Sequence, residues 1–180
     1  MALKSTIYKA VLSIADMDRS YYADHHLTLA LHPSETEERM MLRLVAFALN
    51  ASDTLEFTKG ISTDDEPDLW QKSLSDEIEL WIDLGLPDES RVRKACNRAQ
   101  QAILYTYGGR AVPIWWDKHR NKFTRFDNLT VINLPQDDST ELTKLANRSM
   151  HLQITIQDGS VGISDGEHHL EITPEPMPLR

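Results

Sequence analysis

Apolar residues recur in the first third of the chain with two periods, one typical of strands and one typical of a helix. Residues 7–16 predict a strand, and residues 27–31 alternate as a second strand with one buried face. From 40 to 49, apolar residues recur at helical spacing, which predicts a helix that begins near Ser34. Ser34 and Glu37 have the spacing of a capping box, in which each side chain accepts a backbone N–H at the helix start.

The rest of the chain reads as short segments separated by turn residues. A strand is expected at 55–58, followed by two runs around Trp70 and Trp81 that form a hairpin. The further predicted elements are a helix opened by Pro87-Asp88, a strand at 102–107, a short helix at 113–121, a strand at 129–134, a helix at 140–148 and a β-meander through 152–156, 161–163 and 170–172. This order predicts one α/β domain over residues 1–180, with a mixed central sheet flanked by helices and an antiparallel C-terminal meander.

Two aspartates stand at matching places in the predicted hairpin. If the hairpin turns at Ser75-Asp76, its facing pairs are Asp68 with Asp83, Trp70 with Trp81, and Lys72 with Glu79. The aromatic pair and the opposite-charge pair stabilise neighbouring strands, but facing carboxylates repel. A divalent metal ion is one way to make the carboxylate pair favourable. The alternative is an exposed hairpin face on which both acids are solvated.

Composition and charge narrow the functional classes. The single cysteine, Cys96, excludes an intrachain disulfide and a cysteine-rich zinc site. Without an apolar run of about 18 residues or a signal-peptide core, we expect a cytoplasmic protein that does not enter a membrane. The net charge of −9 disfavours general nucleic-acid affinity, yet residues 88–125 hold nine basic residues against three acidic ones. This asymmetry indicates either a phosphate-binding face or segments that complement each other in the fold.

The order of the central elements has a known counterpart. The order of the predicted elements is similar to that of the restriction-endonuclease-like core of the PD-(D/E)XK nuclease superfamily: helix, strand, strand with Asp68, strand with Asp83, helix and strand. Pro67-Asp68 takes the place of the Pro-Asp, and Asp83-Leu84-Gly85 takes the place of the (D/E)-x-K. The whole chain resembles the bacterial YaeQ family more closely. The residues that carry this match are Leu3-Lys4, Pro33-Ser34-Glu35-Thr36 to Met40-Met41, Asp64-Asp65-Glu66-Pro67, Leu80-Trp81-Ile82-Asp83-Leu84-Gly85-Leu86-Pro87-Asp88-Glu89, Lys94-Ala95-Cys96, Ile114-Trp115-Trp116 and Ile156-Gln157-Asp158-Gly159.

The superfamily resemblance implies a site that binds Mg²⁺, with Mn²⁺ as the alternative, and hydrolyses phosphodiester bonds. The roles implied are metal ligation by Asp68, Asp83, Glu66 and Glu38, activation of the attacking water by Lys94, and phosphate binding by Arg91 and Arg98. Gly85 departs from the pattern, because glycine has no side chain to position a water. The superfamily tolerates migration of that lysine into the following helix, where Arg91, Lys94 and Arg98 share one face.

Two functions therefore remain open from the sequence. The first is a Mg²⁺-dependent nuclease that acts on nucleic acid. The second is a catalytically inactive module on the same fold that binds nucleic acid or a protein partner. Trp115-Trp116, followed by Lys118-His119-Arg120, could stack on and neutralise a single nucleic-acid strand, or they could pack in the core or at its edge. Simpler interpretations stand beside the other assignments too: Glu38 as a solvated residue, residues 64–66 as a polar turn, and the basic helix face as solvated.

Overall fold

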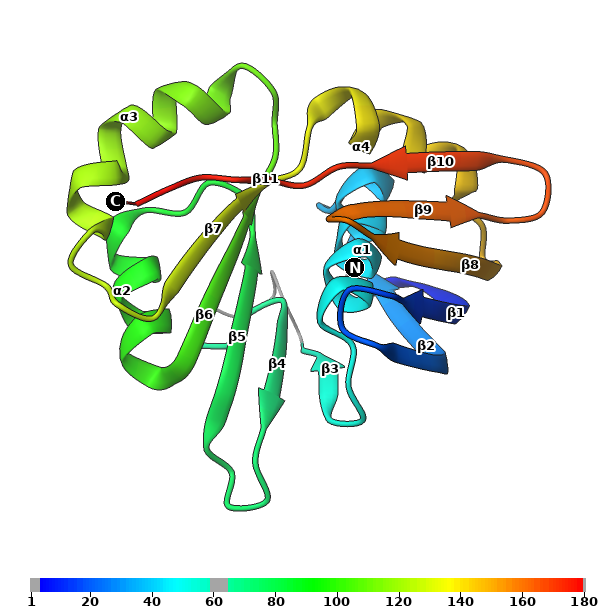
Figure 1. Cartoon of the computed structure of the whole chain (residues 1–180), viewed down its shortest axis with the longest axis horizontal. Helices are drawn as coiled ribbons and strands as arrows, with labels where there is room; N and C mark the ends of the chain where they lie inside the picture. The colour runs from blue at the N-terminus through cyan, green and yellow to red at the C-terminus, as the bar shows by residue number, and fades with distance from the viewer. Residues whose placement is uncertain (1–3, 59–64, 180) are drawn as a thin grey trace. The chain divides into compact units, whose positions relative to one another are not determined.

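The protein has a mixed α/β fold, seen in a computed structural model that describes residues 4–58 and 65–179. The described residues form four α-helices and two mixed sheets (Figure 1). The chain divides into two compact units, one of residues 1–50 with 137–174 and one of residues 51–136 with 175–180. The prediction of one central sheet is wrong, because the strands divide between two sheets. The prediction of a single domain over 1–180 stays a prediction.

The first unit is built on a five-stranded sheet in the order β10-β9-β8-β1-β2. Its strands are β1 (Thr6–Asp16), β2 (Tyr21–Leu31), β8 (Ser149–Gln157), β9 (Ser160–Ser164) and β10 (His169–Ile172). β1 and β8 are parallel, and the other neighbours are antiparallel. The predicted C-terminal meander is therefore confirmed as β8, β9 and β10. Asp158 and Gly159 both have positive φ, as the tight turn between β8 and β9 requires.

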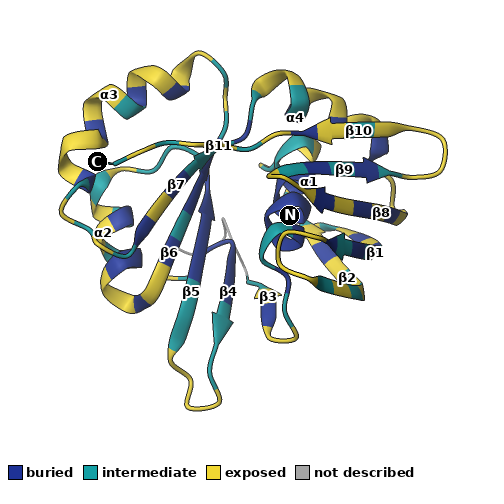
Figure 2. Ribbon diagram, viewed as in Figure 1, coloured by how far each residue is buried: buried dark blue, intermediate teal, exposed yellow. Residues whose placement is uncertain are grey.

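One face of this sheet is buried and the other is exposed. β8 alternates exposed and buried residues along its whole length, as the period-two pattern predicts (Figure 2). Helix α1 (Glu37–Asn50) contacts β1 and β2, and its residues from Met40 to Ala48 are all buried. No helix in the described part of the chain is both long enough and apolar enough to span a membrane.

The start of α1 differs from the capping-box prediction. Thr36 caps the helix, because its Oγ1 accepts the backbone N–H of Arg39 at 3.1 Å. Ser34 lies in a turn with His32, whose Nδ1 is 2.7 Å from the Ser34 hydroxyl. Glu37 accepts a hydrogen bond from the Tyr8 hydroxyl on β1. The capping-box prediction is wrong because both side chains of the box have other partners in the folded chain.

The second unit is built on a six-stranded sheet in the order β11-β7-β6-β5-β4-β3. Its strands are β3 (Leu55–Phe57), β4 (Leu69–Lys72), β5 (Ile78–Leu84), β6 (Ala99–Thr106), β7 (Leu129–Asn133) and β11 (Glu175–Pro176). The first three form an antiparallel meander, β5, β6 and β7 run parallel, and β11 pairs antiparallel with β7. Helix α2 (Glu89–Arg98) connects the parallel neighbours β5 and β6, as expected for a crossover.

Helices α2 and α3 (Ala111–Phe123) share a core with this sheet (Figure 1). The core includes Trp81 from β5, Val92 and Cys96 from α2, and Trp115 and Phe123 from α3. The small side chains of α2 therefore pack against the sheet, and Trp115 is a core residue as the simpler interpretation held. The predicted helix at 140–148 begins earlier, as α4 (Gln136–Leu142) followed by a 3₁₀ turn (Thr143–Leu145).

Candidate functional site

The hairpin register brings Asp68 and Asp83 together. Trp70 pairs with Trp81 and Leu69 with Ile82, which confirms the predicted register up to the residue beside Asp68. The Asp68 backbone N–H donates to Ile82 O at 3.0 Å and reaches Asp83 Oδ1 at 3.3 Å. Both aspartates are buried, with exposed fractions of 4% and 8%. The two acids thus lie side by side away from solvent, and a solvated hairpin face is ruled out.

The other end of the hairpin departs from the prediction. The register shifts between Gln71 and Lys72, so Lys72 faces Ile78 and not Glu79. The Lys72 ammonium lies 4.0 Å from the centre of the Trp70 ring and 3.7 Å from Asp76 Oδ1. The irregularity lies on the turn side of the tryptophan pair, so the register beside Asp68 is unaffected.

Arg91 of α2 binds both carboxylate oxygens of Asp83. Its Nε–H donates to Oδ2 at 3.0 Å, and its Nη2 donates to Oδ1 at 3.0 Å. Trp81 Nε1–H, two residues before Asp83 on β5, donates to Oδ2 at 2.9 Å. Together with the Asp68 N–H, these groups give Asp83 four N–H donors, two of which belong to the positively charged Arg91 guanidinium. Its negative charge is therefore balanced inside the protein.

The start of α2 fixes the position of Arg91. Asp88 is the N-cap, and its Oδ1 accepts the Arg91 backbone N–H at 2.9 Å and the Ser90 hydroxyl at 2.8 Å. The hydrogen bond from the Arg91 N–H, followed by that from Ser90, lowers the pKa of Asp88. Arg91 Nη2 also donates to Glu66 O at 2.8 Å. The Asp88 cap therefore fixes the backbone of Arg91. The Arg91 guanidinium is fixed by Asp83 on β5 and by Glu66 O, which lies before β4.

Asp68 binds the backbone of the neighbouring strand, and Gly85 explains why no lysine stands there. Asp68 Oδ2 accepts the Leu84 N–H at 2.8 Å. The next residue, Gly85, has φ +123°, a conformation that residues with a Cβ rarely adopt. Its N–H donates to Tyr105 O at 2.9 Å, which ties this bend to β6. The place of the (D/E)-x-K lysine is therefore taken by a backbone bend that favours glycine.

The other predicted site residues lie on the segment at 65–66 and on α2. Lys94 Nζ is 3.8 Å from Asp65 Oδ1, and Arg98 Nη1 donates to Asp65 O at 2.6 Å. The guanidiniums of Arg98 and Arg91 lie 5.3 and 5.7 Å from the centre of the Trp81 ring. Asp64 lies outside the described residues. The assigned roles of Lys94, Arg98 and Glu66 stay predictions.

Glu38 belongs to the first unit. Its Oε1 accepts a hydrogen bond from the Ser139 hydroxyl of α4 at 3.2 Å, and Ser139 is fully buried. This bond gives Glu38 a role in joining α1 to α4. Its predicted part in metal binding stays a prediction.

The donor set can be tested against the Mg²⁺ that the resemblance implies. Mg²⁺ needs near-octahedral oxygen coordination, with at least one or two carboxylates turned toward it. Asp83 already accepts four hydrogen bonds, two of them from the Arg91 cation. Within residues 4–58 and 65–179, no three His, Cys, Asp or Glu side chains gather as a metal site. As arranged, these residues do not fit a resident Mg²⁺ ion, and the metal assignment of Asp68 and Asp83 stays a prediction.

Sequence reasoning missed two features of this unit. Trp81 donates to Asp83, which its position two residues earlier on the same strand face could have indicated. Glu89 gathers three cations: Arg93 one helical turn away, Lys122 in the last turn of α3, and Arg125 just after that helix. The Glu89–Arg93 spacing is visible in the sequence. The approach of residues 122 and 125 depends on how α3 packs, which no local pattern encodes.

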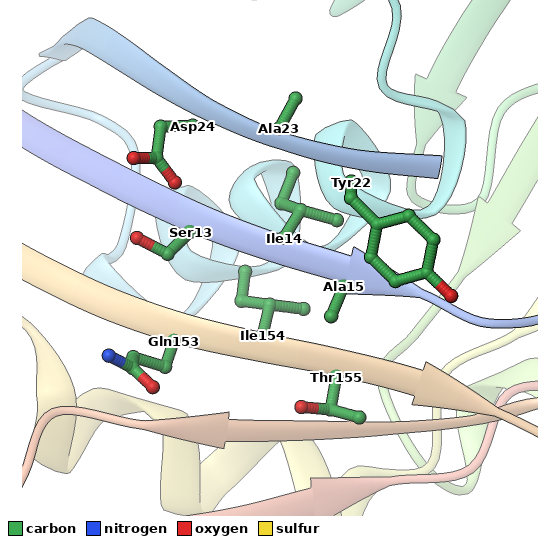
Figure 3. Close-up of a pocket in the computed structure, with 9 residues that line it drawn as sticks. All are labelled: Ser13, Ile14, Ala15, Tyr22, Ala23, Asp24, Gln153, Ile154 and Thr155. Atoms are coloured by element: carbon green, nitrogen blue, oxygen red, sulfur yellow. The ribbon is translucent and has the colours of Figure 1, made fainter. Parts of the chain in front are cut away.

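A separate pocket lies on the exposed face of the first unit's sheet. It has a volume of about 490 Å³ and lies over β1, β2 and β8 (Figure 3). Tyr22 and Asp24 line one side, Gln153 and Thr155 the other, and Ser13 and Ala15 lie between them on β1. Asp24 is the one carboxylate among the nine lining residues that Figure 3 labels. The predicted site residues all lie elsewhere.

Comparison with known proteins gives a consistent match over nearly the whole chain. The family model described as YaeQ protein matches residues 1–174. The YaeQ protein of Salmonella typhi is 51% identical over 172 residues, which cover 96% of this chain and 95% of that protein. The YaeQ protein of Escherichia coli (strain K12) is 49% identical over 172 residues, with the same coverage.

Two crystal structures of YaeQ proteins have the same fold. The protein from Xanthomonas axonopodis pv. citri has a TM-score of 0.93 and 52% identity, with 96% of this chain and 97% of that chain covered. The protein from Pseudomonas syringae has a TM-score of 0.92 and 35% identity, with 97% of this chain and 96% of that chain covered.

Proposed function

The chain belongs to the YaeQ protein family, and from its site we propose that it binds nucleic acid through α2 and the end of α3 without a catalytic metal ion. Arg93 of α2, with Lys122 and Arg125 at and just after the end of α3, gives three half-exposed cations within a segment of net positive charge on an otherwise acidic protein. Arg91 is not counted among them, because it is bound to Asp83. Cations placed together in this way neutralise backbone phosphates, which supply most of the affinity of non-specific binding. The acidic remainder of the chain confines that binding to one surface.

The observation that carries the metal-independent part is the pairing of Arg91 with Asp83. Two parallel hydrogen bonds from the Arg91 guanidinium both balance the negative charge of the Asp83 carboxylate and fix its orientation. Removing one partner of a buried pair leaves the other uncompensated, so a metal ion could displace Arg91 only at a considerable cost. Gly85 supports the same conclusion, because no side chain there can position a water beside Asp83.

Fluorescence anisotropy with labelled single-stranded and duplex DNA and RNA, in the presence of EDTA, tests the proposal. We expect binding at low salt that weakens as salt rises, with a slope of about −0.7 to −0.9 per neutralised phosphate on a log–log plot. Millimolar Mg²⁺ should act only as added salt, and Asp83→Ala should leave binding in place if the variant folds. Binding that needs a divalent cation would refute the proposal. Absence of nucleic-acid binding at low salt would refute it too, and would point to a protein partner.

A metal-dependent nuclease is the second candidate, and the topology of the second unit favours it. The β3-β4-β5 meander followed by the parallel β5-α2-β6 crossover has the strand order expected for a PD-(D/E)XK core. Asp68 and Asp83 lie at the positions that resemblance assigns to metal ligands. Incubation of the same oligonucleotides with Mg²⁺ or Mn²⁺ separates the candidates. Cleavage by the wild type that is lost in a folded Asp83→Ala variant would establish the nuclease in place of the binding module.

A further inference from the structure

Three basic side chains converge on one carboxylate at the junction of α2 and α3. Arg93 Nη2 lies 3.1 Å from Glu89 Oε1, and Lys122 Nζ lies 3.8 Å from Glu89 Oε2. Arg125 also donates to Glu89 Oε1. We call Glu89, Arg93, Lys122 and Arg125 the Glu89 cluster. It belongs to none of the predicted site assignments and uses neither Asp68 nor Asp83.

The Glu89 cluster carries excess positive charge at the surface. Three cations against one carboxylate leave a net charge of +2. The side chains of Arg93, Lys122 and Arg125 are 50%, 53% and 53% exposed, whereas that of Glu89 is 22% exposed. The hydrogen bond from Arg93, with the charges of Arg125 and Lys122, lowers the pKa of Glu89, so its carboxylate stays ionised. One ionised carboxylate therefore holds three cations near one another without neutralising them.

We infer that the Glu89 cluster is a phosphate-binding site, which in the proposed function contacts the backbone of the bound nucleic acid. Two guanidiniums and an ammonium within reach of one point supply the donors that a phosphate group needs. The net charge of +2 exceeds the single negative charge of a backbone phosphodiester, so the cluster can neutralise at least one such group. Arg125 stacks on Phe126 with its guanidinium 5.0 Å from the ring centre. This stacking orients the guanidinium while its edge remains available for hydrogen bonds.

Glu89 acts as a weak competitor for the same cations. Exposed ion pairs contribute little, because water screens them and their long side chains lose freedom. A phosphate placed outside the cluster can therefore take these cations from Glu89 at small cost. The carboxylate keeps the three side chains gathered before binding, but it also lowers their affinity for an anion. This dual role predicts opposite effects when the cations and Glu89 are changed separately.

The test uses variants of the full chain with matched controls. In Arg93→Gln/Lys122→Gln/Arg125→Gln the cations are neutralised, and in Glu89→Gln the competitor is neutralised. Lys144 and Glu141 form an exposed pair in the first unit, so Lys144→Gln and Glu141→Gln show the effect of losing one charge of either sign outside the cluster. Thermal unfolding shows which variants are folded. The measured quantities are the affinity for a fluorescent oligonucleotide and its salt dependence.

We expect the triple variant to bind more weakly, with a log–log salt slope that is shallower by about 0.7 to 0.9 for each phosphate that the variant no longer neutralises. We expect Glu89→Gln to tighten binding about two- to fivefold, the most that release of an exposed ion pair supplies. The controls should differ from the wild type by less than either. Nucleic-acid binding that is the same in the triple variant as in Lys144→Gln would overturn the inference and leave the proposed function standing.

A second probe separates failure of the inference from failure of the proposed function. Pyrophosphate, followed by ¹H–¹⁵N NMR, tests the site without nucleic acid. If no oligonucleotide binds the wild type, pyrophosphate-dependent shifts at 89–93 and 122–126 that vanish in the triple variant would support a phosphate site with another phosphate ligand. If pyrophosphate causes no shifts there either, the inference is wrong.

Discussion

The Arg91–Asp83 pair gives the most direct test of the proposed site. Replacement of Arg91 by methionine keeps much of the side-chain volume and removes both hydrogen bonds to Asp83 and the bond to Glu66 O. Asp83 then keeps only the N–H groups of Trp81 and Asp68 as donors. The carboxylate would remain inside the protein with its charge uncompensated.

The magnitude follows from burial. Breaking a fully buried ion pair by removing one partner costs about 3–5 kcal/mol, whereas exposed pairs contribute about 0–1 kcal/mol. The Arg91 and Asp83 side chains are 22% and 11% exposed. For a pair of this intermediate burial, we expect Arg91→Met to lower the free energy of unfolding by about 2–4 kcal/mol. Asp83→Asn removes the charge that Arg91 compensates, so the two changes should be strongly non-additive, with a coupling energy of about 2 kcal/mol.

Urea unfolding of the wild type, both single variants and the double variant measures this coupling. Arg93→Met is the matched control, because Arg93 lies on the same helix in an exposed pair and should change stability by less than about 1 kcal/mol. Equal m-values would show that the same surface unfolds in each variant. The reasoning fails if the coupling energy is below about 0.5 kcal/mol, or if Arg91→Met and Arg93→Met cost the same.

Three further predictions follow from residues around this site. Gly85→Lys should restore the superfamily pattern in sequence but lower the free energy of unfolding by about 1–3 kcal/mol, because φ is +123°, and it should yield no cleavage with Mg²⁺. Burial, followed by Lys118 and Lys122, lowers the pKa of His119 below its unfolded value. The unfolded chain then binds more protons, so His119 lowers the stability of the folded protein as pH falls below about 6.5. Between about pH 7.5 and 5.5, the melting temperature of His119→Phe should therefore rise relative to that of the wild type. Parallel pH profiles of the two melting temperatures would contradict this. Burial raises the pKa of Cys96 to about 11, so the native thiol should react with Ellman's reagent at pH 8 at least about 100-fold more slowly than in urea; equal rates would show that Cys96 is accessible.

The sequence predicts the local part of the fold well. The Trp70–Trp81 register follows from facing side chains about a known turn, and the confirmed meander follows from clean alternation in β8. The register beyond Gln71 could not be predicted, because Asp76 adopts a positive φ and lengthens the turn around Ser75. Alternation also shows that a strand has one buried face, but it does not show which strand is its neighbour. The parallel pairing of β1 with β8, and hence the division into two sheets, was therefore out of reach.

The position of the candidate site was predicted from the sequence, and the roles assigned to its residues stay predictions. The sequence placed Asp68 beside Asp83, and it also singled out Arg91 and the glycine at 85. It could not show that Arg91 reaches both Asp83 oxygens, because that depends on the angle at which α2 leaves β5. The bend at Gly85 and the Asp88 cap both lie between β5 and the first turn of α2, and both act through backbone geometry. Arg91, to which the resemblance assigns phosphate binding, is the hydrogen-bond partner of Asp83, and its predicted role stays a prediction.

Helix α2 carries two arginines, Arg91 and Arg93, that have different roles on opposite faces of the helix. Residues 91 and 93 are about 200° apart around the helix axis, so Arg91 turns toward Asp83 on β5 while Arg93 pairs with Glu89 on its own helix. The inward guanidinium is held by three hydrogen bonds and serves stability, whereas the outward one shares a carboxylate with two other cations and remains half exposed. Substitutions two residues apart should therefore separate the two properties: Arg91→Met should mainly lower stability, and Arg93→Gln should mainly weaken binding. If the protein were a metal-dependent nuclease, Arg91→Met should instead change catalysis first, because Arg91 binds the Asp83 carboxylate that would hold the metal ion.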